Sequence, residues 1–157
     1  MSVVRRETRA KQTLRLWLRL LSTHNLIEQH IRHNLMQRFE CTLPQFDVLA
    51  ELEHAGEAQT MSQVSRNLMV TNGNLTGVVD RLAREGLVAR EVSPRDRRVQ
   101  HLSLTAHGRE RFEAMAAEHE RWLAELFADL TRDRLDETAD AIHQLRDALR
   151  SRLNPAK

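Results

Sequence analysis

The chain has 157 residues, of which 41% are hydrophobic, and its formal net charge at pH 7 is +2. This length suits one compact domain or one subunit of a small oligomer, and it excludes two independent hydrophobic cores. The single cysteine excludes an internal disulfide framework, and no apolar run approaches the roughly 18 residues that cross a bilayer, so we expect a cytoplasmic protein without a membrane partner.

The first predicted element is a long helix over residues 10–38, which contain neither glycine nor proline. Nothing within this stretch can cover its apolar stripe, so the stripe must pack on other helices of this chain or of a partner. Arg15 and Arg19 interrupt the apolar positions, which excludes a secretory signal. The stripe recurs at mostly helical spacings and consists of Leu14, Trp17, Leu18, Leu21, Ile27, Ile31 and Leu35.

The segment ECTLPQF, residues 40–46, ends this helix and begins a second one. Thr42 and Gln45 have the spacing of a capping box, and Pro44 lies in the first turn, where a missing amide hydrogen matters little. Gly56 is a natural stop. The second helix therefore runs to about residue 55, and its predicted buried face consists of Phe46, Leu49 and Leu52.

Two features of this region have an alternative chemical interpretation. Cys41 lies at the junction of the two helices, and a redox-sensing thiol there is an alternative, although Glu40 beside it disfavours a thiolate. His30 and His33 lie three residues apart, but no nearby cysteine or carboxylate completes a metal-ligand set. We therefore expect no metal and no cofactor.

Two short helices follow. Thr60 and Gln63 repeat the capping-box spacing before a helix of about two turns. After a break at residues 69–70, Thr71 can cap a further helix that ends at Gly86. One face of this helix buries Leu75, Val78 or Val79, and Leu82. The other face begins with short hydrogen-bonding side chains, namely Thr71, Asn72, Asn74 and Thr76.

Gly73 and Gly77 lie within the second of these helices. A glycine in a helix interior is less favourable than alanine by roughly 1 kcal/mol. Two of them indicate a close approach to another surface, which a helix in the major groove of DNA would provide. The alternative for Gly73 is a frayed first turn.

After Gly86 the hydrophobic period changes to short β-compatible runs, which predict a two-stranded hairpin over residues 87–104. Its tip is SPRDRR, residues 93–98. Arginine suits phosphate contacts and insertion into a narrow minor groove, and Asp96 can hold one arginine in a fixed orientation. A charged tip alone is usually a solvated turn, so the succession of helix, turn, helix and hairpin is what favours DNA binding.

The charge is unevenly distributed along the chain. Residues 61–101 contain seven arginines against four acidic residues, whereas residues 109–150 contain seven arginines against eleven acidic residues. A basic middle followed by an acidic region favours a polyanionic partner for the middle. A general bias toward arginine explains the total but not this asymmetry.

Two more helices are predicted at the C-terminal end. Thr105 begins one of roughly 25 residues whose apolar positions reach Leu130, and Thr131 can cap the last one. Long amphipathic helices at both ends cannot all be buried within one chain of this size. We therefore expect a two-fold homodimer, which carries two copies of the basic segment to the two halves of a pseudo-palindromic DNA site.

The order of these elements, the segment VVDRLAREGLVAR and the hairpin DRRVQHLSLTAHG resemble the MarR family of bacterial winged helix-turn-helix regulators. The resemblance covers essentially the whole chain and implies one domain over residues 1–157. It implies a mainly α fold with a small β-hairpin, in which a winged helix-turn-helix lobe spans residues 43–104. The helical dimerisation region comprises residues 10–38 and 105–152.

By this resemblance, residues 71–85 form the recognition helix and residues 90–102 form the wing. Arg97 or Arg98 would enter the minor groove, and Asp96 would orient an arginine. Asp80, Arg81 and Arg84 would brace the helix or touch phosphates. The predicted DNA-binding residues are Thr71, Asn72, Asn74, Thr76, Arg81, Arg84, Arg95, Asp96, Arg97 and Arg98.

The resemblance also implies an effector pocket between the first, second and fifth helices. The matching positions are Trp17, His24, Arg32, Phe46 and Met115. Arginine and histidine beside aromatic and methionine surface suit a small aromatic acid or its coenzyme A thioester, although ordinary packing explains each residue equally well. The function expected is a ligand-responsive transcriptional repressor. The alternatives are a redox-responsive regulator acting through Cys41 and a helical protein-interaction module. An enzyme is disfavoured because the sequence has no recognisable phosphate loop, nucleophile or metal cluster.

Overall fold

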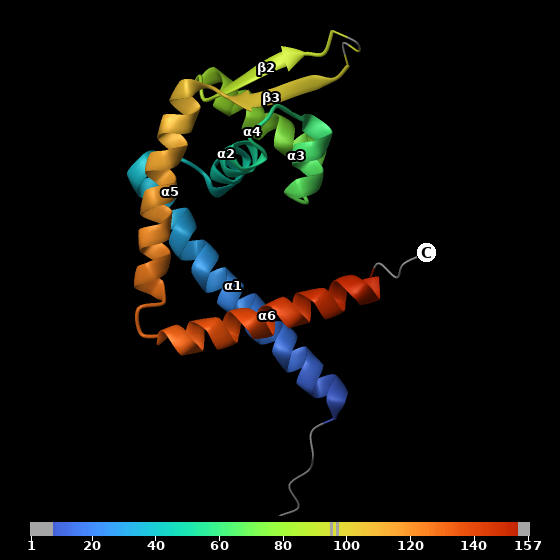
Figure 1. Ribbon diagram of the computed structural model, residues 1–157, viewed down its shortest axis with the longest axis vertical. Coiled ribbons are helices and arrows are strands. Elements are labelled where there is room, and N and C mark those ends of the chain that lie inside the picture. Colours follow the sequence, from blue (N-terminus) through green and yellow to red (C-terminus); the bar gives the residue numbers. More distant parts are fainter. Residues whose placement is uncertain (1–7, 95, 97, 154–157) are drawn as a thin grey trace, which may run out of the picture. The chain divides into compact units, whose positions relative to one another are not determined.

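The computed structural model describes residues 8–94, 96 and 98–153 (Figure 1). Within these residues the chain forms six helices and a small antiparallel sheet, which confirms the predicted fold class. Met1–Glu120 and Arg121–Lys157 are two compact units, and each is described by itself. A search of the described residues finds no helix with the length and apolarity that a bilayer span requires.

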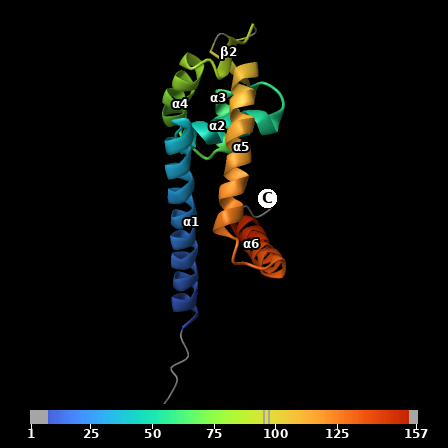
Figure 2. The same cartoon turned by 90° about the vertical axis from the view of Figure 1, so that its left-hand side faces the viewer.

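Helix α1 spans Arg9–Phe39, as the absence of glycine and proline predicts. Only Ile31 and Leu35 of this helix are buried, both near its C-terminal end. In Figure 2 this end meets the other helices of its unit, while the N-terminal half extends away from them. Leu14, Trp17 and Leu18 on that half are 56%, 57% and 53% exposed.

Helices α2 (Leu43–Ala55) and α3 (Met61–Asn67) begin with the two expected capping boxes. The Thr42 N–H donates to Gln45 Oε1 at 2.8 Å, and the Gln45 N–H donates back to Thr42 Oγ1 at 3.4 Å. Thr60 and Gln63 repeat the arrangement with distances of 2.8 and 3.2 Å. These reciprocal bonds satisfy amide groups that a helix start otherwise leaves unpaired.

Helix α4 spans Asn72–Arg84 and is followed by strands β2 (Val88–Val92) and β3 (Gln100–Leu104). The sequence predicts two strands, but the sheet has three. Gln59–Thr60 forms the short strand β1, which pairs with the outer side of β3 in the order β1-β3-β2. A strand of two residues is too short to produce an alternating pattern.

The core of the first unit forms where α2, α4 and the sheet meet, and α1, α3 and α5 contribute side chains to it. Close packing of this kind gives the first unit one continuous hydrophobic interior. The largest fully buried residues are Leu35, Val48, Leu49, Val64, Leu75, Val79, Leu82, Leu102 and Met115.

Helix α5 (Ala106–Leu126) starts at a crowded junction with the sheet. The Thr105 hydroxyl donates to Gly86 O at 2.7 Å and accepts from the Gly108 N–H at 2.9 Å. A Cβ at position 108 would lie 1.9 Å from Leu87 O, so only glycine fits. At its other end α5 stops at Leu126, earlier than the apolar periodicity predicts.

The second unit comprises the last turns of α5 and helix α6 (Arg132–Leu153). The Thr131 hydroxyl accepts from the Arg134 N–H at 3.4 Å, as expected for the cap. Helix α6 buries none of its residues. Leu135, Ile142 and Leu149, spaced seven residues apart, are 38%, 51% and 51% exposed and form an apolar stripe.

Candidate nucleic-acid interface

Helix α4 is covered on one side and open on the other. Leu75, Val79 and Leu82 point into the core and are at most 1% exposed, whereas residues 71–74 and 76–77 are exposed. All four short polar side chains predicted to contact DNA therefore lie on the open side. This amphipathic placement follows from apolar residues recurring at three- and four-residue steps.

The four polar residues divide into two kinds. The Thr71 hydroxyl accepts from the Asn74 N–H at 3.4 Å, and the Thr76 hydroxyl donates to Asn72 O at 2.8 Å. Both threonines thus stabilise the first turns of α4. Within the described chain the side-chain amides of Asn72 and Asn74 form no hydrogen bond. They retain the paired donor and acceptor that can recognise an adenine edge in the major groove.

Gly73, Gly77 and Arg84 lie four and seven residues apart and share the outward face of α4. A Cβ at either glycine would meet no atom of the described chain within 4 Å. Packing within this chain therefore does not require glycine at these positions. The two glycines leave a strip of α4 without side chains, and such a strip would let another molecule approach the helix backbone closely.

An ion pair joins α4 to the first strand of the hairpin. Arg90 Nη2 on β2 lies 2.5 Å from Asp80 Oδ1 on α4. Arg81 pairs instead with Glu85 on its own helix, at 2.9 Å, and Arg84 is exposed. Asp80 therefore braces α4 against the hairpin, and its partner is Arg90, which is not among the predicted DNA-binding residues.

The tip of the hairpin is organised by Asp96. Its Oδ1 accepts from the Arg98 backbone N–H at 2.9 Å, and its carbonyl accepts from the Val99 N–H at 2.9 Å. Asp96 thus shapes the turn through the backbone, and Arg98 is exposed there. The predicted contacts of Arg95 and Arg97 lie outside the described residues.

A groove of about 360 Å³ separates α4 from the hairpin. Asn72 and Thr76 line it from α4, and Arg90, Arg98 and Gln100 line it from the hairpin. Asn74 lies on the other flank of α4, beside Leu75 and Val78 in a different cavity. The two asparagines consequently face opposite sides of the helix, and only Asn72 shares a surface with the arginines of the hairpin.

The predicted effector residues are only partly brought together. Phe46 and Met115 are buried, and the Phe46 ring lies 5.6 Å from that of Phe112 and 5.1 Å from that of His119. The pKa of His119 is lowered, because the effect of burial outweighs the opposing effect of the Glu120 carboxylate. The periodicity of α5 already places His119 among its apolar positions.

The remaining effector candidates are on the exposed side of α1. His24 Nε2 lies 3.1 Å from Glu28 Oε2, and Arg32 pairs with the same carboxylate. Trp17 lies nearer the N-terminus and is 57% exposed. The polar candidates therefore meet at Glu28, apart from the buried cluster around Phe46.

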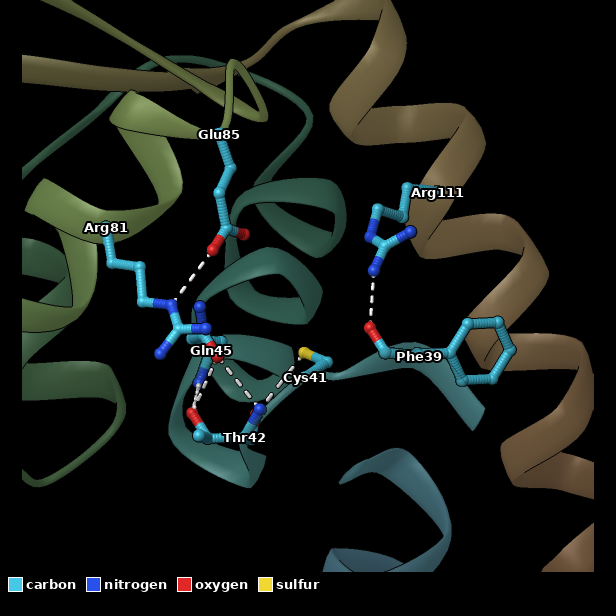
Figure 3. A network of polar contacts seen from close by, with 7 residues as sticks. All are labelled: Phe39, Cys41, Thr42, Gln45, Arg81, Glu85 and Arg111. Carbon is cyan, nitrogen blue, oxygen red and sulfur yellow. Dashed lines mark hydrogen bonds and ion pairs between the residues drawn. The ribbon is translucent and has the colours of Figure 1, made fainter. Parts of the chain in front are cut away.

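The surroundings of Cys41 oppose the redox alternative (Figure 3). Burial raises the pKa of the Cys41 thiol to about 11, and its S–H donates to Thr42 O at 3.4 Å. Nearby, the Arg111 guanidinium donates to Phe39 O and is thus engaged in joining α5 to the end of α1. A thiol held in its protonated form is a poor nucleophile. No group of three or more His, Cys, Asp or Glu that could hold a metal occurs in residues 8–94, 96 and 98–153.

Comparison with known proteins agrees with this geometry. The MarR family model matches residues 41–99. The chain is 33% identical over 110 residues to the HTH-type transcriptional regulator YkoM of Bacillus subtilis, a match that covers 70% of each protein.

Two solved structures have the same fold. A MarR family transcriptional regulator from Silicibacter pomeroyi is 28% identical with a TM-score of 0.78, over 92% of this chain and 99% of that one. Sco3205 of Streptomyces coelicolor, solved in complex with DNA, is 23% identical with a TM-score of 0.78, over 99% and 95%. The family model and the Bacillus subtilis relative confirm the prediction of a transcriptional regulator. The chain belongs to the MarR family of DNA-binding transcriptional regulators.

Proposed function

We propose that two copies of this chain form a two-fold dimer that represses transcription from a pseudo-palindromic operator and leaves it when a small ligand binds. The observation that carries the proposal is the open face of α4. There two free asparagine amides flank a glycine strip, and Arg98 stands across the groove. One such surface reads one half-site, so a dimer is needed for both halves.

In this proposal the side chains have separate tasks. Asn72 and Asn74 read base edges in the major groove, while Thr71 and Thr76 hold the first turn of α4 in place. Arg81, Arg84 and the arginines of residues 95–98 supply the contacts to phosphates and to the minor groove.

The dimer is supported by apolar side chains that the described chain leaves uncovered. Helix α6 exposes its stripe of Leu135, Ile142 and Leu149, and α1 exposes Leu14, Trp17 and Leu18 among others. Exposed apolar surface of this extent marks an interaction site. A second copy of the chain offers the same stripes and therefore a self-complementary partner.

The proposed ligand is a small aromatic acid or its coenzyme A thioester, bound near α1, α2 and α5. Phe46 and Met115 supply apolar surface, and Trp17, His24 and Arg32 supply an aromatic ring and positive charge. A ligand that prefers one arrangement of the two α4 helices shifts the dimer away from the DNA-binding arrangement.

A gel-shift and footprinting experiment on the DNA upstream of the protein's own gene tests the regulator. We expect two protected half-sites about one helical turn apart and an affinity that falls steeply with salt. Arg98→Ala weakens binding to all sequences, whereas Asn72→Ala and Asn74→Ala also relax the sequence preference. Binding without sequence selectivity or salt dependence would overturn the proposal in favour of a helical interaction module.

The ligand is tested separately, by a thermal-shift screen of aromatic acids and their thioesters. A true effector raises the melting temperature by mass action and reduces DNA binding in the gel shift. If no compound of this class stabilises the dimer, the protein regulates without such a ligand.

A further inference from the structure

A cavity of about 370 Å³ lies beside α4, between α2 and the turn that joins α3 to α4. Its residues all belong to the unit Met1–Glu120. A cavity of this size with mostly apolar walls is typical of a small-molecule site. The apolar wall consists of Pro44, Val48, Leu68, Val70, Leu75 and Val78.

The remaining two residues of the wall are polar, and one of them is Asp47. The Asp47 side chain is half-buried, and it forms no hydrogen bond or ion pair with any described residue. Burial raises the pKa of Asp47, and Glu28 raises it further while Arg32 lowers it. Arg32 is already paired with Glu28, so no cation among the described residues forms an ion pair with the Asp47 carboxylate.

We propose that this cavity binds a small hydrophobic amine, with its ammonium group at Asp47 and its apolar body between α2 and α4. An unpaired, half-buried carboxylate is stabilised by a cation that also displaces water from the apolar wall. An acid of the same shape is repelled by Asp47. The chemistry of this cavity is therefore opposite to that of the site proposed above near α1, α2 and α5.

Occupation of the cavity also affects DNA binding, a step that rests on the proposed function. Asn74 lines the cavity and is one of the two residues proposed to read bases. An amine that contacts Asn74 and Val78 from this side competes with the DNA for the amide and fixes the position of α4. The amine thus acts as an effector distinct from the aromatic acid.

Calorimetric titration with three ligands of similar shape tests the charge requirement. Phenethylamine carries a positive charge, 2-phenylethanol is neutral and 3-phenylpropionate is negative. We expect phenethylamine to bind at least tenfold more tightly than the alcohol, and the carboxylate to bind most weakly. Equal affinities for amine and alcohol, or no binding by the amine, would overturn the proposal.

Two variants locate the site. Asp47→Asn should reduce the affinity for phenethylamine at least tenfold and leave that for 2-phenylethanol unchanged, and it should fold because it removes an unpaired half-buried charge. Val78→Phe fills the cavity and should reduce the affinity for both compounds. Glu57→Gln, which removes an exposed charge of the same unit, is the matched control and should change neither. A wild-type affinity in Asp47→Asn contradicts the assignment.

The same proteins, tested in a gel shift with and without phenethylamine, separate this inference from the proposed function. DNA binding without the amine tests the regulator alone. Amine binding measured by calorimetry tests the cavity even if the DNA result is negative. If the amine binds but leaves DNA affinity unchanged, its role as an effector is wrong.

Discussion

The winged part of the chain, residues 43–104, buries most of its large apolar side chains, whereas helices α1 and α6 expose most of theirs. Between α2 and β3 the large apolar side chains are mostly buried, and Leu49, Leu82 and Leu102 are completely inaccessible. Helix α6, by contrast, buries none of its residues, and α1 buries two of its 31. The winged part has a closed core to which α1 and α5 also contribute, whereas most of α1 and all of α6 leave their apolar side chains uncovered in the described chain.

This difference separates the two requirements of a DNA-binding dimer. The open face of α4 is positioned by contacts within one chain, so its local shape is independent of the partner. In the proposed dimer, the spacing of two such faces would depend on surfaces that a single chain leaves uncovered. Substitutions in the two regions should therefore have different consequences, in folding for one and in assembly for the other.

The largest effect is expected for Gly108→Ala, at the junction of β2 and α5. The added Cβ would overlap Leu87 O, at 1.9 Å, and the backbone of both elements must move. We expect a loss of roughly 2–4 kcal/mol in the free energy of unfolding, measured by urea denaturation. A variant that unfolds like the wild type would show that this junction is loose and that the closed core of the winged part tolerates movement there.

Ile142→Glu places a charge in the α6 stripe and should break the assembly without unfolding the winged part. If the monomer holds only one half-site, DNA affinity falls roughly 10²- to 10⁴-fold through loss of bivalent binding. Light scattering should report the monomer, and Gln144→Glu, which adds the same charge to the polar side of α6, should remain dimeric. A dimeric Ile142→Glu protein would place the interface elsewhere.

Gly77→Ala should have effects of opposite sign on stability and on function. Alanine is the better helix former, so the free energy of unfolding should rise by up to about 1 kcal/mol, because open space surrounds the position. DNA affinity should fall, since the added methyl group occupies the glycine strip of α4 that is proposed to face the major groove of the DNA. Thermal melting and gel shifts on one sample test both signs. If both the free energy of unfolding and the DNA affinity rise, Gly77 is not part of the DNA-binding surface.

The smallest effect concerns His119, which packs against Phe46. Burial lowers the pKa of His119 below its usual value, so the unfolded chain takes up a proton more readily than the folded one. The stabilising contribution is complete above about pH 6.5 and is lost as the pH falls toward the folded-state pKa. Because the ring is partly exposed, the loss should be less than about 1 kcal/mol.

His119→Gln removes this titration. Histidine changes its charge between about pH 5 and pH 8. Over this range, the free energy of unfolding of the variant should decline less on acidification than that of the wild type. Parallel curves for the two proteins would mean that His119 is protonated equally in both states.

Local signals in the sequence predict much of the fold. Thr42 with Gln45 and Thr60 with Gln63 mark two helix starts that the structure confirms, because a capping box is made within four residues. The two-residue strand at Gln59 has no such local signal. It exists only because β3 presents a free edge from 40 residues further along the chain.

The candidate site is predictable to the same extent. The polar face of α4 follows from helical periodicity, so the exposure of Asn72 and Asn74 could be expected. The pairing of Asp80 with Arg90 requires the hairpin to fold back on α4, and the position of Asp47 over a cavity requires α2 and α4 to meet. Neither relation can be read from spacing, because each joins residues on different elements.

Helix α5 is 21 residues long. At 1.5 Å per residue its length is about 30 Å, and a straight rod of that length amplifies small rotations. A tilt of roughly 5° about one end displaces the other by about 3 Å, close to the 3.4 Å rise of one base step. Thr105 anchors the start of this rod to the residue that ends the turn after α4. In the proposed regulator, a tilt of this size at the end of α5 joined to Gly86 would shift α4 along the DNA by most of one base step.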